Sequence, residues 1–347
     1  MILPARRTRR RSSSLLFVSW LSLAAAAGAD GAGRELPGGQ LGPRVASPEA
    51  PLLATPGSGP GLDASPGLHE VSVQAGGLTR WALYYVPVGY DPAVPSRLVI
   101  ALHGGGGGMF NMADSRTDLL ALADAKTFLV IFPNGQDGVD NRGASGWKAV
   151  HCCGEVFLQG QSDVDFVLAL VRSFEAGLAV DPRRIHAVGF SNGGMLTHLL
   201  AAEASEVFAS VAVLSGTIGG SFDLASPVAT VVPEAPMPIL MIHGIADTNV
   251  SYRGGFSSDN AERFDLSFEA SMALWVANDG CRQLGTVRSS RGERGAVFRR
   301  SHAGCLAGTE VVGISLENVG HTWPDLESAG FDGTTEAVEF FERHPRP

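Results

Sequence analysis

The sequence predicts an α/β fold: a single domain with a mostly parallel central sheet and helices on both faces. Apolar segments of strand length alternate with helix-like segments from residue 98 onward, and strands covered by helices on both sides form parallel sheets. The 347 residues are 45% hydrophobic, which is enough for one sizeable core. A glycine-rich turn at 189–194 also joins an expected strand directly to an expected helix.

The expected elements follow in chain order. Strands at 71–73 and 81–86 suit an antiparallel opening. Further strands are expected at 98–102, 128–132, 185–188, 207–214, 238–243 and 311–316, and helices at 113–125, 163–176, 195–204, 267–277 and 335–343. Ser162 can cap the second helix, and Asp163 and Asp165 lie in its first turn, where acids favour the helix dipole. We therefore expect both acids to be structural.

The N-terminal region divides into two segments ahead of the domain. Five arginines within residues 6–11 precede an apolar run at 15–27 and a small-residue cleavage pattern, so 1–29 is predicted to be a secretory signal peptide. A membrane anchor is the rival, but the apolar run is shorter than the roughly 20 residues of a spanning helix. Residues 30–66 form a Gly-, Pro- and Ala-rich linker that we expect to be disordered, and 67–347 form the folded domain.

The charge balance limits the possible partners. Loss of the leader takes the net charge from −9 to about −14 and leaves no basic stripe for nucleic acid. Such a surface tolerates neutral ester or sugar substrates better than polyanions. We expect a secreted protein, extracellular or periplasmic, with no stable membrane insertion after signal cleavage.

Four cysteines allow three fully paired connectivities in an oxidising compartment. Cys281 with Cys305 is favoured because a hairpin-like return between them could bring them together. The adjacent Cys152 and Cys153 must then form a vicinal bridge, stay reduced or pair elsewhere. With His151 they resemble a fragment of a metal site, but they lack the spaced ligand pairs of structural zinc sites, so no metal is predicted.

The turn at 189–194 carries the first candidate for chemistry, Ser191. A strand, a tight glycine turn with a serine and then a helix are the context of a nucleophile elbow. The bare Gly-x-Ser-x-Gly pattern is weak in a chain with 44 glycines, so partners elsewhere must support it.

A glycine loop at 104–108 follows His103 at the end of a strand. Glycines let backbone N–H groups point into a site, as an oxyanion hole requires. In elbow proteins one donor comes from such a loop and the other from the residue after the nucleophile, here Asn192. The alternatives are a phosphate loop, which lacks the following Gly-Lys-Ser/Thr, and a merely flexible loop.

The acid candidate is Asp247, in a loop after an apolar strand and downstream of the serine. It would fix the tautomer of a catalytic imidazole. Asp259 and Asp265 are alternatives, but neither closely follows a strong strand. His243, at the end of the strand before Asp247, is expected to be structural.

The base candidate is His321, in a glycine-flanked loop after the last strand. It follows Ser191 and Asp247 in the required order of serine, acid and histidine. The tail residue His344 and the strand residue His186 fit less well.

Four motifs together, at 102–104, 189–195, 243–247 and 320–324, resemble the secreted polyhydroxybutyrate depolymerase and feruloyl esterase family over roughly 68–343. The resemblance implies an α/β-hydrolase fold with a triad and oxyanion donors. It also implies that two tryptophans line the substrate cleft. The residues are Ser191, Asp247 and His321 for the triad, Gly105 and Asn192 for the donors, and Trp147 and Trp323 for the cleft. The chain departs from the family at Val319 and Asp325, where glycines are usual, and at Ser162, where an acid is common.

The sequence therefore predicts an exported serine carboxylic ester hydrolase that works through an acyl-enzyme without a cofactor. Its substrates would be hydroxyalkanoate esters, or feruloyl or acetyl esters of polysaccharides. A secreted serine peptidase on the same fold and a non-catalytic polymer-binding protein are the alternatives.

Overall fold

The computed structural model describes residues 61–347 except 115–116, 137–144, 160 and 283–284. The predicted signal peptide at 1–29 and the linker up to residue 60 lie outside the described residues and stay predictions. Ahead of the first strand, Leu62 packs against the core, and the Asp63 amide donates to the hydroxyl of Tyr84. Within the described part of the chain, every helix is too short or too polar to cross a membrane.

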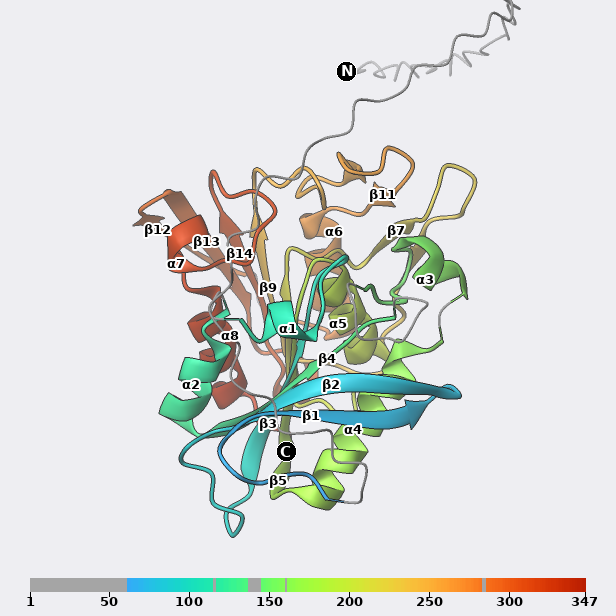
Figure 1. Cartoon of the computed structure of the whole chain (residues 1–347). Coiled ribbons are helices and arrows are strands. Elements are labelled where there is room, and N and C mark those ends of the chain that lie inside the picture. The colour runs from blue at the N-terminus through green and yellow to red at the C-terminus, as the bar shows by residue number, and fades with distance from the viewer. Residues whose placement is uncertain (1–60, 115–116, 137–144, 160, 283–284) are drawn as a thin grey trace, which may run out of the picture. The chain divides into compact units, whose positions relative to one another are not determined.

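A ten-stranded sheet forms the centre of the domain, in the order β1-β2-β4-β3-β5-β6-β9-β14-β13-β12 (Figure 1). The strands are β1 Gly67–Ala75, β2 Leu78–Val86, β3 Ser96–Leu102, β4 Phe128–Pro133, β5 Val180–Phe190, β6 Ser210–Leu214, β9 Ile239–Gly244, β12 Thr286–Gly292, β13 Gly295–His302 and β14 Val311–Leu316. The run from β4 to β14 is parallel, and both edges are antiparallel. This arrangement is the α/β-hydrolase fold and confirms both the parallel sheet and the antiparallel opening.

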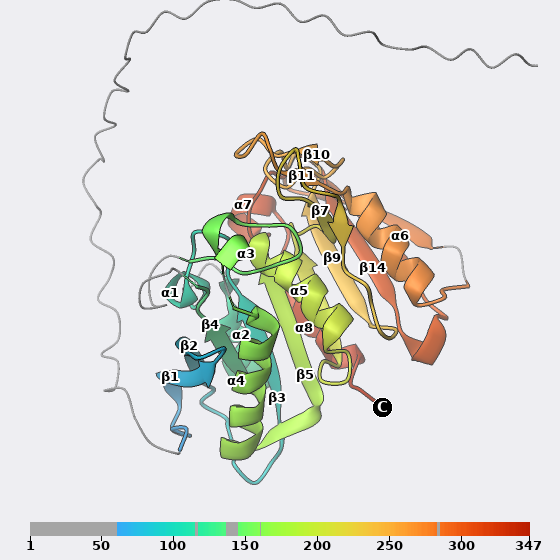
Figure 2. The same ribbon diagram turned by 90° about the vertical axis from the view of Figure 1, so that its right-hand side faces the viewer.

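Helices cover both faces of the sheet, and the buried hydrophobic side chains form two clusters. The helices are α1 Met109–Met112, α2 Leu119–Lys126, α3 Gly154–Gln159, α4 Asp163–Gly177, α5 Asn192–Glu203, α6 Phe268–Asn278, α7 Leu326–Ala329 and α8 Gly333–Arg343. Helices α4, α5 and α6 lie on one side of the sheet (Figure 2). Their buried side chains belong to one cluster, and those of α1, α2 and α8 belong to the other. As predicted, the Ser162 hydroxyl caps α4 by accepting the Asp165 amide hydrogen at 3.1 Å.

Three features differ from the expected elements. The helix expected at 113–125 is shorter than predicted: α1 ends at Met112, ahead of that range, and α2 begins only at Leu119, after Asp118 in a left-handed conformation (φ 52°). Between Cys281 and Cys305 only a hairpin-like return was expected; its strands β12 and β13 were not predicted, since β12 is exposed along nearly its whole length and has no apolar alternation. A second sheet of short strands was also missed; its members are β7 Gly219–Ser221, β8 Ala229–Thr230, β10 Gly255–Phe256 and β11 Phe264–Asp265.

Both cysteine pairs form disulfides. Cys281 and Cys305 are joined, as predicted, and the β12–β13 hairpin makes the return between them. Cys152 is joined to its neighbour Cys153, which is the first of the three alternatives left open by the sequence.

Candidate active site

The predicted motifs meet at one edge of the sheet. The glycine loop follows β3, Ser191 follows β5, Asp247 follows β9, and His321 lies beyond β14. These four strands are parallel neighbours or near neighbours in the sheet. Because the carboxyl ends of parallel strands share an edge, residues far apart in the sequence converge there.

The turn at Ser191 has the geometry of a nucleophile elbow. Ser191 has a positive φ of 55° and stands immediately before α5. A Cβ on Gly189 would collide with the carbonyl oxygen of Gly193, and one on Gly193 with that of His103. Glycine is therefore required at both positions, and the tight turn leaves the serine side chain at the strand end.

Three of the predicted residues form one hydrogen-bonded chain. His321 Nδ1 lies 2.7 Å from Asp247 Oδ2, and His321 Nε2 lies 2.8 Å from Ser191 Oγ. Because a carboxylate can only accept, Nδ1 carries the hydrogen, and Nε2 of the neutral ring can accept from the serine hydroxyl. Phe190 packs against the imidazole at a ring distance of 4.9 Å and limits its orientation.

The Asp247 carboxylate is buried and accepts hydrogen bonds on both oxygens. Oδ1 accepts the backbone N–H groups of Asn249 and Val250, each at 3.0 Å. Oδ2 accepts from His321 and lies 3.2 Å from Nε2 of His243. Burial alone would raise the pKa of Asp247, but the hydrogen bonds from the two histidines hold it below its usual value. The carboxylate is thus stabilised in its charged form.

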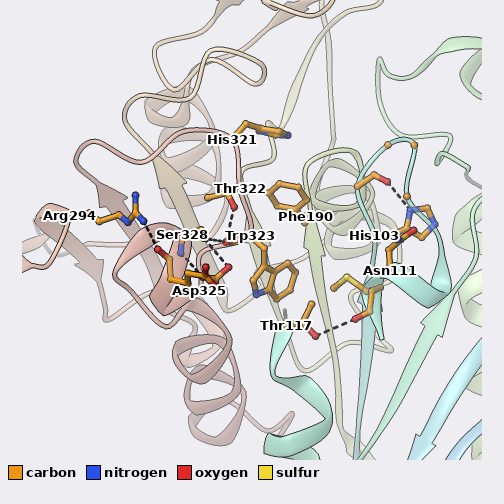
Figure 3. Close-up of a pocket in the computed structure, with 16 residues that line it drawn as sticks. His103, Asn111, Thr117, Phe190, Arg294, His321, Thr322, Trp323, Asp325 and Ser328 are labelled. Carbon is orange, nitrogen blue, oxygen red and sulfur yellow. Dashed lines mark hydrogen bonds between the residues drawn. The ribbon is translucent and has the colours of Figure 1, made fainter. Parts of the chain in front are cut away.

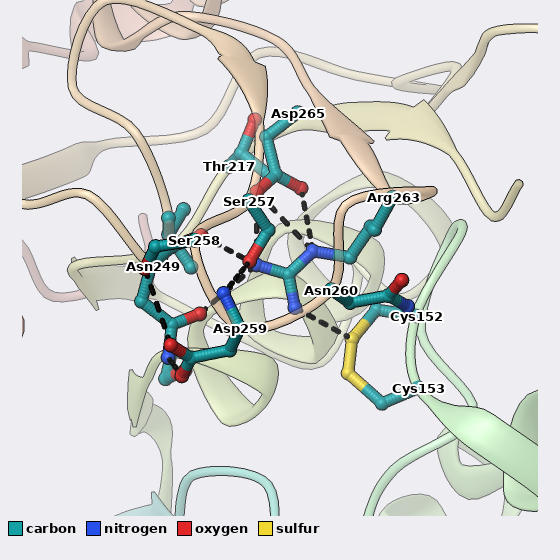
Figure 4. Close-up of polar contacts among 12 residues, drawn as sticks. Cys152, Cys153, Thr217, Asn249, Ser257, Ser258, Asp259, Asn260, Arg263 and Asp265 are labelled. Carbon is teal, nitrogen blue, oxygen red and sulfur yellow. Dashed lines mark hydrogen bonds and ion pairs between the residues drawn. A yellow bond between two sulfur atoms is a disulfide. The ribbon is translucent and has the colours of Figure 1, made fainter. Parts of the chain in front are cut away.

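The two alternative acids serve another purpose. Asp265 is paired with the guanidinium of Arg263 and with His151 Nε2, and Asp259 is bonded to the side chain of Asn249. Arg263 also donates to the backbone oxygen of Asn249 at 2.7 Å (Figure 4). Both acids therefore hold the loop that follows Asp247 instead of contacting His321.

The same cluster explains the segment that resembled a metal site. His151 is bonded to Asp265 at 2.8 Å. Cys152 Sγ accepts from the Arg263 guanidinium at 3.8 Å (Figure 4). Among the described residues, no group of three or more His, Cys, Asp or Glu side chains could hold a metal ion.

His103 fixes the glycine loop. Its Nε2 accepts the Gly135 amide at 3.0 Å, so Nδ1 carries the hydrogen and donates to the Gly104 carbonyl at 2.8 Å. Burial lowers the pKa of His103 to about 4, which keeps the ring neutral. In a trans peptide the N–H points opposite to the C=O, so the Gly105 N–H is directed away from His103.

Asn192 opens α5, and its backbone N–H is one of the four at a helix start that have no intrahelical acceptor. Its side chain makes two hydrogen bonds to the backbone of Trp147: Oδ1 accepts the Trp147 N–H at 2.7 Å, and Nδ2 donates to the Trp147 carbonyl oxygen at 3.2 Å. Gly105 lies beside Asn192, since a Cβ on Gly105 would be 3.6 Å from that of Asn192. The two predicted donors are therefore neighbours.

The prediction that Trp147 lines the cleft was wrong. Trp147 is fully buried, and its indole N–H donates to the His103 carbonyl at 2.7 Å. Trp147 supports the glycine loop from inside the core, because Asn192 holds its backbone and the His103 carbonyl holds its indole ring. The sequence could not reveal this, since both partners are more than 40 residues away.

A cavity of about 760 Å³ opens beside His321 and the glycine loop. Phe190 and Trp323 lie next to each other on one wall, with polar groups around them (Figure 3). Asp325 caps the short helix α7 by accepting the Ser328 amide, so its departure from the usual glycine has a local structural role. Arg294, in the turn between β12 and β13, also lines the cavity.

Comparison with known proteins agrees with this geometry. The sequence model of the family described as Esterase PHB depolymerase matches residues 79–254. The chain is 31% identical to a Nocardia uniformis subsp. tsuyamanensis protein named as an esterase, NocK, over 90% of both chains. It is 30% identical to feruloyl esterase C of Emericella nidulans, over 71% of this chain and 78% of the relative.

Among solved structures, the acetyl xylan esterase from Aspergillus awamori superposes with a TM-score of 0.55 at 17% identity, covering 80% of this chain and 99% of that one. At that identity the likeness shows the α/β-hydrolase fold alone. The family match and the two relatives show more: the chain belongs to the PHB depolymerase esterase family and is a carboxylic ester hydrolase.

Proposed function

We propose that the chain hydrolyses carboxylic esters through an acyl-enzyme formed on Ser191, with His321 as the general base and Asp247 as its orienting acid. The observation that carries this proposal is the continuous hydrogen-bonded chain from Asp247 through His321 to Ser191, at 2.7 and 2.8 Å. These distances lie within the hydrogen-bond reach expected of a nucleophile, its base and the group that orients the base.

In the first half-reaction Ser191 Oγ attacks the ester carbonyl carbon while His321 Nε2 takes the hydroxyl proton. The carbonyl oxygen becomes an oxyanion, which the backbone N–H groups of Gly105 and Asn192 would bind. The intermediate then collapses: the bond to the alcohol oxygen breaks, and His321 returns the proton to the departing alcohol. An acyl group remains on Ser191.

In the second half-reaction a water molecule attacks the acyl carbon and gives its proton to His321. Collapse of this second intermediate releases the carboxylic acid and restores the Ser191 hydroxyl. Asp247 stays ionised throughout and stabilises the imidazolium that forms twice in each cycle. Its lowered pKa supports that role.

For the substrate we propose hydroxyalkanoate esters, or feruloyl or acetyl esters of polysaccharides. The aromatic wall of Phe190 and Trp323 gives an apolar surface for an acyl chain or a sugar ring. Thr322, Ser328 and Asn111 add groups that can bond hydroxyls. A relative named feruloyl esterase C and a structural neighbour named acetyl xylan esterase support this range.

We also propose that the enzyme is exported, on the evidence of the basic and apolar leader at 1–29. Expression of the full chain with N-terminal sequencing of the released protein tests this. Cleavage near residue 29 is expected, and an uncleaved chain kept in the cell would contradict it.

The central experiment compares Ser191→Ala with Ser210→Ala on nitrophenyl butyrate, hydroxybutyrate trimer, methyl ferulate and acetylated xylan. Ser210 is a matched control because its hydroxyl lies 2.8 Å from a buried imidazole, that of His186, outside the lining of the cavity. We expect Ser191→Ala to abolish turnover of every substrate and Ser210→Ala to retain it. Full turnover by Ser191→Ala would refute the proposed function.

A further inference from the structure

A second imidazole touches the acid of the proposed triad. His243 is the fifth of six residues in β9 and is almost completely buried. Its Nε2 lies 2.9 Å from the backbone oxygen of Val250 and 3.2 Å from Asp247 Oδ2. The sequence suggested only a structural histidine at this position.

The partners of His243 determine where its hydrogen lies. A carbonyl oxygen and a carboxylate oxygen can both only accept, so Nε2 must carry the hydrogen and donate to both. One N–H thereby links the carboxylate to Val250, whose own amide donates to Asp247 Oδ1 at 3.0 Å. His243 and His321 therefore both donate to the same carboxylate oxygen, Asp247 Oδ2.

The ring of His243 is itself fixed by packing. Tyr252 and Phe268 meet it edge-on, each at a ring distance of 5.8 Å. The Tyr252 hydroxyl is bonded to Ser315, the residue opposite His243 on β14. The imidazole is thus held between β14, α6 and the loop after Asp247, and it cannot turn its N–H away from the carboxylate without repacking them.

We propose that His243 is a positioning residue for Asp247: its Nε2–H fixes the carboxylate oxygen that orients His321 and keeps that carboxylate charged. This inference rests on the proposed function, in which His321 is the general base. It adds a fourth residue to the hydrogen-bonded chain, one that never contacts the substrate.

The test replaces the donor while keeping the volume. His243→Met removes the N–H, and His243→Gln returns an amide N–H at a similar reach. A hydrogen bond to a charged group supports an expected loss of ~10- to 100-fold in kcat for His243→Met, with KM for nitrophenyl butyrate little changed. His243→Gln should recover most of that loss.

His198→Met is the matched control. His198 is a fully buried histidine that accepts the indole N–H of Trp275 at 3.1 Å and has no bond to the triad. The His198→Met variant should have a lower thermal midpoint of unfolding and an unchanged kcat. Equal losses of kcat in His243→Met and His198→Met would show a general packing effect and overturn the proposal.

A measurement on the wild-type enzyme does not depend on whether a variant folds. With ¹⁵N-labelled histidine, NMR should show the His243 ring carrying its hydrogen on Nε2. A bare Nε2 would overturn the proposal. The two proposals also fail separately: activity in Ser191→Ala refutes the triad, whereas an inactive Ser191→Ala beside a fully active His243→Met refutes only the role of His243.

Discussion

Asp163 and Asp247 are both buried carboxylates with side chains fully removed from solvent, yet their surroundings differ. Asp163, the first residue of α4, is paired with the Arg80 guanidinium of β2 at 2.7 Å. Asp163 also accepts the Lys148 amide at 2.6 Å. Asp247 likewise accepts backbone N–H groups, two of them, but its side-chain donors are two imidazole N–H groups.

The difference lies in the kind of donor. Arg80 carries a permanent charge, so its pairing with Asp163 ties a helix to a strand and offers no proton that could be exchanged in a reaction. His321 is a group that can gain a proton and lose it again, so the charge facing Asp247 can change during a reaction. Burial of an acid therefore does not identify a site, and neither does an imidazole partner, since Asp265 is bonded to His151. Asp247 differs because its partner His321 also contacts the Ser191 hydroxyl.

The largest effect is expected from Asp247→Asn. Loss of the charge and of the correct His321 tautomer should lower kcat by ~10⁴-fold, as such a change does in serine proteases. Steady-state kinetics measure kcat, and thermal melts check that the variant is folded. Asp279→Asn is the control, because Asp279 is also buried but bonds Thr309 and the Met237 amide. Comparable kcat values for Asp247→Asn and Asp279→Asn would show that Asp247 is no more important for turnover than another buried acid.

The converse change, Asp163→Asn, should act on stability. It removes the negative charge that faces the buried Arg80 guanidinium, at a cost of about 3–5 kcal/mol in the free energy of unfolding. Urea denaturation measures this, with the neighbouring Asp165→Asn as control. The loss of kcat should be far smaller than in Asp247→Asn. If the folded Asp163→Asn protein were equally inactive, Asp163 would belong to the site.

Acid should reduce the contribution of Asp247 to stability. Its folded-state pKa lies below the ordinary value of 3.8, so its stabilising contribution is complete above that value and is lost as the pH falls through the folded-state pKa. The difference in unfolding free energy between wild type and Asp247→Asn should therefore shrink from pH 5 to pH 3. A difference that stays constant over this range would contradict the lowered pKa.

The smallest effect is expected from Ser162→Ala. It removes the hydroxyl that caps α4 next to Asp163, at a cost of about 1 kcal/mol in the free energy of unfolding. Turnover should be unchanged. A loss as large as that of Asp163→Asn would mean that the helix start, and not the Arg80 pair, carries the stability of this region.

Local chemistry predicted much of the molecule. The parallel strands and the α4 cap followed from periodicity and capping residues close in sequence, and the Cys281–Cys305 pairing followed from the hairpin-like return expected between the two cysteines. The strands β12 and β13 within the expected return did not, because an exposed edge strand needs no apolar face and so leaves no alternation to detect. The small second sheet has strands of two or three residues, too short for any period to show.

By itself the sequence determined the identities and order of Ser191, Asp247 and His321 and the strand ends that carry them, because glycine turns and apolar strands are local properties. The tertiary structure alone decided which neighbours each would have. It joined His321 to partners 74 and 130 residues away, buried Trp147 beneath the glycine loop and turned His243 toward Asp247. Such contacts depend on how the strands pack side by side, which no short stretch of the chain encodes.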